Sequence, residues 1–142
     1  MTDNEKILTK INQITHMGLV GIDSVLPLAR HDAMRQALQV QRLEYQRLGA
    51  QAQNLAKTKG LNPRDHAKLA GQLSTLGAKM KLMTRNPDSK IADMMIQGNT
   101  RGMIQSLKGM HHVTDPDPEI AALAQTLLQT QIHNIRSMEG FL

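Results

Sequence analysis

The chain has 142 residues, a formal net charge of +5, no cysteine or tryptophan, and one phenylalanine and one tyrosine. Without cysteine it can form no disulfide, thiolate metal site or cysteine nucleophile. No segment is apolar enough to span a bilayer, and the N-terminus lacks the apolar core of a signal peptide, so we expect a cytoplasmic protein. Ten methionines, together with Leu, Ile and Ala, must fill the core. This composition favours helices over strands.

Apolar residues recur at alternating spacings of three and four along the chain, which predicts helices and no strands. The first helix is expected at 4–28, with Asp3 or Asn4 as its N-cap. Pro27 should kink its last turn, because proline lacks the backbone donor and crowds the preceding turn.

The second helix is expected at 32–59, capped by Asp32 and ended by Gly60, since glycine readily adopts the left-handed conformation of a helix terminus. A third is expected at 64–84, as a crossover that packs beside a four-helix core. The whole chain, 1–142, is predicted to be one helical-bundle domain.

The fourth helix is expected at 88–112, because Pro87 interrupts the apolar pattern and Asp88 or Ser89 can serve as N-cap. The fifth is expected at 117–140. There the Asp-Pro-Glu sequence supplies a cap, a proline at the first helical position and an acidic first turn.

Three glycines lie on the fourth predicted helix, in the stretch IQGNTRGMIQSLKGMHH. Gly98, Gly102 and Gly109 share one helical face, because they are four and seven residues apart. Each glycine costs a helix about 1 kcal/mol relative to alanine, so something close by should offset that cost. The candidates are the close approach of another helix, and room for a side chain or a small ligand.

Folding the helices as two hairpins places Gln41 opposite Gly18 and Gln131 opposite Gly98. We therefore predict that these glutamines lie across the bundle on bare glycine backbone, and that Gly98→Leu destabilises by overpacking. The Tyr45 hydroxyl should find Gln131 or Gln97. The predicted polar layer of the core consists of Gly18, Gln41, Glu44, Tyr45, Gln97, Gly98 and Gln131.

Paired hairpins with a polar residue in each seam, and the stretches KIADMMIQGNTRGMI and NIRSMEGFL, resemble a family of uncharacterised bacterial ferritin-like four-helix-bundle proteins. The resemblance implies an up-down bundle and brings no established activity. In di-metal members of this fold, two helices supply one Glu each and two supply Glu-x-x-His. The matching positions here are Gly18, Gly98, Gln41 to Glu44, and Gln131 to Asn134.

These departures predict that the metal ligands are lost, because neutral glutamine is a poor substitute for carboxylate or imidazole. We expect no metal, no cofactor and no tightly bound iron. Glu44 should be held ionised by Arg42 or Arg47. The histidines are expected to be scattered surface or capping residues.

No catalytic constellation or nucleotide-binding motif is present, which favours a non-enzymatic protein. The first hypothesis is a bundle with a structural Gln/Gly layer that acts through a protein partner or as a homo-oligomer, away from membranes. The second is weak, non-specific nucleic-acid binding by scattered basic residues. The third is a small-ligand or metal site at the bundle centre. The basic residues considered for the second are Arg30, Arg35, Arg42, Arg47, Lys57, Lys59, Arg64 and Lys68.

Overall fold

The computed structural model describes residues 1–64 and 85–142, and every regular element in these ranges is a helix. The predicted helix at 64–84 lies outside the described residues, apart from Arg64, which is not helical. No helix in the two described ranges has the length and hydropathy needed to span a bilayer. The elements are α1 (Asp3–Val25), the short 3₁₀ helix η1 (Leu26–Leu28), α2 (Asp32–Thr58), α4 (Pro87–His111) and α5 (Pro118–Glu139).

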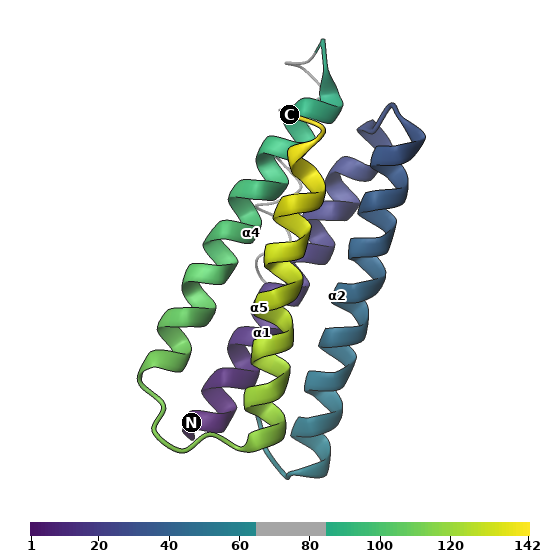
Figure 1. The fold of residues 1–142 in the computed structure, drawn as a ribbon. Coiled ribbons are helices and arrows are strands. Elements are labelled where there is room, and N and C mark those ends of the chain that lie inside the picture. Colours follow the sequence, from purple (N-terminus) through teal and green to yellow (C-terminus); the bar gives the residue numbers. More distant parts are fainter. Residues whose placement is uncertain (65–84) are drawn as a thin grey trace.

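Four helices pack as a bundle of two antiparallel hairpins, α1 with α2 and α4 with α5 (Figure 1). Helix α1 also packs against α4, and α2 against α5. Helices α2 and α4 run in the same direction (Figure 1). Within each hairpin the connection is a short turn.

The core consists almost entirely of aliphatic and methionine side chains, and Tyr45 is its one aromatic residue within the described ranges. The sequence predicted a core of Met, Leu, Ile and Ala, and methionine suits such a core because its side chain adapts to irregular gaps. The larger fully buried residues include Leu8, Ile11, Ile22, Met34, Leu38, Leu48, Ile91, Ile120, Leu127 and Met138.

Helix α1 begins with a capping box that the sequence reading missed. The Thr2 hydroxyl accepts a hydrogen bond from the Glu5 amide (3.1 Å), and the Glu5 carboxylate accepts one from the Thr2 amide (2.9 Å). Two otherwise unpaired donors are thereby satisfied. The expected caps, Asp3 and Asn4, are both wrong; Asn4 Oδ1 instead accepts from the Asp117 amide at the start of α5 (2.9 Å).

The other helix ends follow local signals more closely. Asp117 caps α5 as predicted, whereas Asn86 caps α4 in place of Asp88 or Ser89, with proline at the first helical position. Gly60 ends α2 as predicted, in a left-handed conformation (φ 64°). The Leu61 amide then reaches back to the Ala56 carbonyl at 2.8 Å, as in a Schellman motif. The chain around Pro27 forms η1, so α1 stops at Val25.

The start of α2 is capped from the other hairpin. Asp88, buried in the first turn of α4, accepts hydrogen bonds from the backbone amides of Arg30 (2.8 Å) and His31 (3.0 Å) and from His31 Nδ1 (2.5 Å). The predicted cap, Asp32, lies inside the helix and pairs with Arg35. A carboxylate at a helix N-terminus is also favoured by the helix dipole.

The pKa of Asp88 is lowered from its ordinary value. Burial opposes ionisation, but the hydrogen bonds from Arg30 and His31 outweigh that effect. A lowered pKa in the folded state means that ionised Asp88 stabilises the fold above the ordinary aspartate pKa. That contribution is lost as the pH falls through the lowered value.

We predict that Asp88→Ala lowers the free energy of unfolding at pH 7 by about 2–3 kcal/mol, because two backbone amides lose a charged acceptor. Below about pH 4 the difference between the variant and the wild type should shrink, as Asp88 becomes protonated. Urea denaturation at a series of pH values measures both effects.

Asp23→Ala is the control, because Asp23 pairs with Arg42 at 2.7 Å on the surface and both side chains are more than one-third exposed. Its removal should cost less than about 1 kcal/mol. Equal losses in the two variants would contradict the capping role of Asp88.

Candidate functional site

A groove of about 400 Å³ lies between α1 and α4. Its lining combines glycines from both helices with methionines and amide side chains. The described residues that line it are Ile14, Met17, Gly18, Gly21, Tyr45, Met94, Met95, Gln97, Gly98, Asn99, Arg101, Gly102, Gln105 and Gln131.

Tyr45 forms the floor of the groove by crossing from α2 over Gly18 of α1. A Cβ atom at position 18 would lie 2.7 Å from Cε2 of the ring, so only glycine leaves room for it. The Tyr45 hydroxyl donates to Asn99 Oδ1 (2.5 Å), and Asn99 Nδ2 donates to the Met95 carbonyl (2.8 Å). One side chain thus connects α2, α1 and α4.

The hydroxyl of Tyr45 stays protonated at neutral pH. Burial raises the pKa of Tyr45 to about 12, against a smaller lowering by the Asn134 side chain. Tyr45 therefore acts as a neutral hydrogen-bond donor rather than as an acid or base near pH 7. The sequence analysis predicted Gln131 or Gln97 as the hydrogen-bond partner of the Tyr45 hydroxyl, but the partner is Asn99.

Gln131 of α5 lies on the bare backbone of Gly102. A Cβ atom at position 102 would overlap the Gln131 amide nitrogen. The predicted contact of Gln131 with Gly98 is therefore wrong, because the glycine one turn further along α4 makes it. Gln131 is 1% exposed, and its Oε1 atom has no hydrogen-bond partner among the described residues.

Gly98 and Gly21 face open space in the groove. A Cβ atom at either position would meet no atom of the described residues within 4 Å. The close neighbour on which the predicted overpacking at Gly98 depends is therefore absent from the described residues. On the predicted glycine face of α4, close packing explains Gly102, while Gly98 and Gly109 have open space beside them. The same two situations occur on α1, where Gly18 is closely packed and Gly21 is open.

Three further residues of the predicted polar layer lie away from this floor. Gln41 is buried and donates to Ser137 Oγ of α5 (3.0 Å) rather than facing Gly18. Glu44 is half-buried and pairs with Arg47 at 2.6 Å, as expected. The Arg47 hydrogen bond lowers the pKa of Glu44 against the effect of burial. Gln97 is exposed at the rim of the groove and donates to Asp93 at 2.7 Å.

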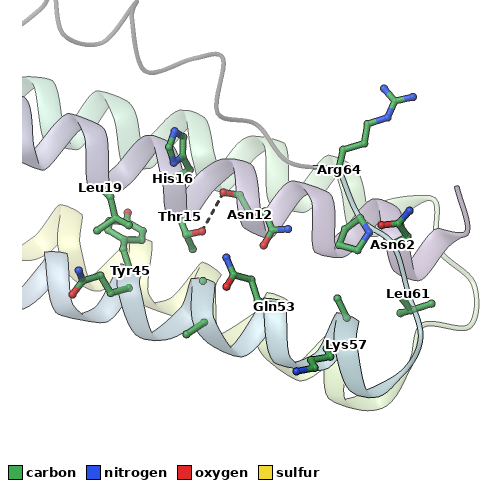
Figure 2. Close-up of a pocket in the computed structure, with 15 residues that line it drawn as sticks. Asn12, Thr15, His16, Leu19, Tyr45, Gln53, Lys57, Leu61, Asn62 and Arg64 are labelled. Carbon is green, nitrogen blue, oxygen red and sulfur yellow. Dashed lines mark hydrogen bonds between the residues drawn. The ribbon is translucent and has the colours of Figure 1, made fainter.

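A second hollow, of about 650 Å³, lies along α1 and α2. Figure 2 shows Tyr45 and Gln53 pointing from α2 toward α1 in this hollow, with Asn12 and Thr15 nearby. Its lining extends to Arg64, the last described residue before position 65, and we assign no site to it.

In the described ranges, no three His, Asp or Glu side chains gather to hold a metal ion.

Two buried polar residues of the core were not part of the predicted polar layer. Asn99 and Asn134 are both buried, and the Asn134 Nδ2 atom has no hydrogen-bond partner among the described residues. Asn99 lies four residues after the buried Met95, and Asn134 lies three residues after the buried Gln131. An asparagine at such a spacing is the signal that could have identified them.

Comparison with known proteins supports the fold. No family model matches the sequence, and no curated protein matches it. The chain is similar to a crystal structure of a DUF305 fragment from Deinococcus radiodurans, with a TM-score of 0.78 and 17% identity over 99% of this chain and 95% of the other. The shared feature is the four-helix fold; the finer resemblance to ferritin-like proteins stays a prediction.

We predict opposite effects of alanine at two glycines on the same helix. Gly21→Ala should stabilise the protein by about 1 kcal/mol, because alanine is the better helix former and its Cβ meets no described atom. Gly18→Ala should destabilise it by about 1–3 kcal/mol, because the Tyr45 ring must move. Urea denaturation gives both values, and a stabilising Gly18→Ala would contradict the described floor.

Proposed function

We propose that the protein is a non-catalytic binding bundle, and that the groove between α1 and α4 holds a small ligand with an apolar part. The observation that supports this proposal is the combination in one groove of two glycines facing open space and a buried glutamine oxygen that finds no partner among the described residues.

The stability of α1 and α4 does not explain why glycine, rather than alanine, occupies positions 21 and 98. Each costs a helix about 1 kcal/mol relative to alanine, yet neither makes room for a described neighbouring side chain. The unpaired Gln131 oxygen adds a desolvation cost of about 1–3 kcal/mol. A ligand that fills the open space and reaches Gln131, directly or through a water molecule, would offset these costs.

The size and lining of the groove suit a small molecule. Its volume of about 400 Å³ lies within the range of about 300–1,000 Å³ typical of ligand pockets. Met17, Met94 and Met95 supply flexible apolar walls that can adapt to a bound shape.

The chemistry of the lining supports binding rather than catalysis. The titratable groups among its described residues are Arg101 and Tyr45, and Tyr45 has a pKa of about 12. The pKa of Tyr45 is too high for general acid–base catalysis near neutral pH, and the described lining contains no carboxylate or imidazole.

A second candidate function, association with a protein partner, is favoured by an apolar pair on the surface. Val40 and Leu43 are adjacent on one face of α2, and each is about two-thirds exposed.

Nucleic-acid binding has less support. The arginines considered for it at 35, 42 and 47 each pair with a nearby carboxylate.

Methionine-methyl NMR tests the ligand site directly. We expect decan-1-ol, added to the full-length protein labelled with ¹³C at the methionine methyl groups, to shift the signals of Met17, Met94 and Met95. The signals of Met34 and Met138, which are buried elsewhere in the core, should stay in place and serve as internal controls.

Gly98→Leu should fill the groove and abolish these shifts, while the fold tolerates it because the Cβ position is open. Gly109→Leu, on the same helix but outside this groove, is the matched control. Persistence of the shifts in Gly98→Leu would overturn the assignment of the groove.

A further inference from the structure

The groove between α1 and α4 is polar at one end and apolar at the other. Ile14 lies beside Gly102, 3.5 Å from the position of a Cβ atom there. Because α1 and α4 are antiparallel (Figure 1), Gly21 lies toward the end of the groove that contains Met94. Arg101, Gln105 and Gln131 supply polar groups at the Gly102 end.

The opposite end consists mainly of apolar side chains and bare backbone, and its polar residue Gln97 lies at the rim, paired with Asp93. Met94 and Met95 belong to the first part of α4 that lines the groove, and Gly21 and Gly98 leave the space beside them open. From Met94 to Gln105 the helix rises about 17 Å, at about 1.5 Å per residue. The site is therefore elongated, with its hydrogen-bonding groups concentrated at one end.

The charge of the polar end is positive. Arg101 is exposed at the rim, and no ion pair joins it to another described residue. The described lining contains no aspartate or glutamate. The amides of Gln105 and Gln131 can donate hydrogen bonds to an anion beside the guanidinium.

We propose that the groove binds an alkyl amphiphile with a single carboxylate head, oriented with the head toward Arg101 and Gln131 and the tail toward Met17 and Met94. This inference rests on the proposed function and names the ligand class for the same groove. The carboxylate pairs with the guanidinium. A water molecule bound to the head donates to Gln131 Oε1, because that oxygen and the carboxylate are both acceptors. The tail covers the open glycines.

Three probes with the same ten-carbon chain separate the contribution of the head from that of the tail. Decanoate and decyltrimethylammonium below their micelle-forming concentrations, and decan-1-ol below its solubility limit, are titrated into the full-length protein while the methionine-methyl signals are followed. We expect decanoate to bind about fivefold more tightly than decan-1-ol, in line with one solvent-accessible ion pair. The cationic probe should bind most weakly.

Arg101→Gln should remove the preference for decanoate and leave the affinity for decan-1-ol unchanged. Lys108→Gln removes the same charge from an exposed position of α4 outside the groove, and should keep the preference. Added salt should weaken decanoate binding alone. Equal effects of the two substitutions would overturn the role of Arg101.

Gln131→Met distinguishes a ligand-binding role of Gln131 from a structural one. Methionine keeps the length of the side chain and removes the unpaired amide. We expect an equally or more stable protein in urea denaturation, with decanoate binding weakened at least threefold. A less stable protein with unchanged decanoate binding would show that the amide serves the fold alone, and would contradict the proposed orientation.

The outcomes also separate the two proposals. If none of the three probes shifts the signals of Met17, Met94 and Met95, the groove is not a ligand site and both proposals are wrong. If decanoate and decan-1-ol shift them with affinities within twofold of each other, the binding function stands and the carboxylate specificity is wrong.

Discussion

The contact of the Tyr45 ring with the bare backbone of Gly18 determines the geometry of the bundle centre. With only one tyrosine, one phenylalanine and no tryptophan in the chain, this is the one place in the described core where a large flat side chain crosses between helices. The ring requires glycine on α1, and its hydroxyl requires an acceptor on α4, which Asn99 supplies. The floor of the groove follows from these two requirements. The wider opening beside Gly21 and Gly98 exists because no comparable side chain fills it.

The sequence predicted the helices well because their signals are local. A repeat of three and four identifies an amphipathic helix without knowledge of its neighbours, and Gly60 and Asp117 end or begin helices through contacts within a few residues. Caps that depend on competition between adjacent polar residues were less predictable. Thr2 was preferred over Asp3 and Asn4 because Glu5 could complete a reciprocal pair with it.

The candidate site was only partly predictable. A spacing of three or four residues does not decide which of two adjacent residues is buried. After Met95, both Gly98 and Asn99 fit a core position, and the structure buries Asn99 while exposing Gly98. The pairing across each hairpin depends on the axial offset of two helices, which no local pattern determines. An error of one turn moved Gln131 from Gly102 to Gly98, and Gln41 proved to face Ser137 instead of Gly18. The sequence therefore identified several residues of the polar layer but not the residues that they contact.

The cap that Asp88 supplies to α2 has a consequence for how the chain folds. The first hairpin contains no side chain that caps the start of its own second helix, so it depends on a carboxylate located more than fifty residues later. The two hairpins look like separable halves, yet Asp88 of the second hairpin binds the backbone amides at the start of α2 in the first. Partial unfolding that releases α4 would expose the amides of Arg30 and His31 and fray α2 from its first turn. Loss of one hairpin is thus coupled to loosening of the other, which favours a single cooperative transition over stepwise melting.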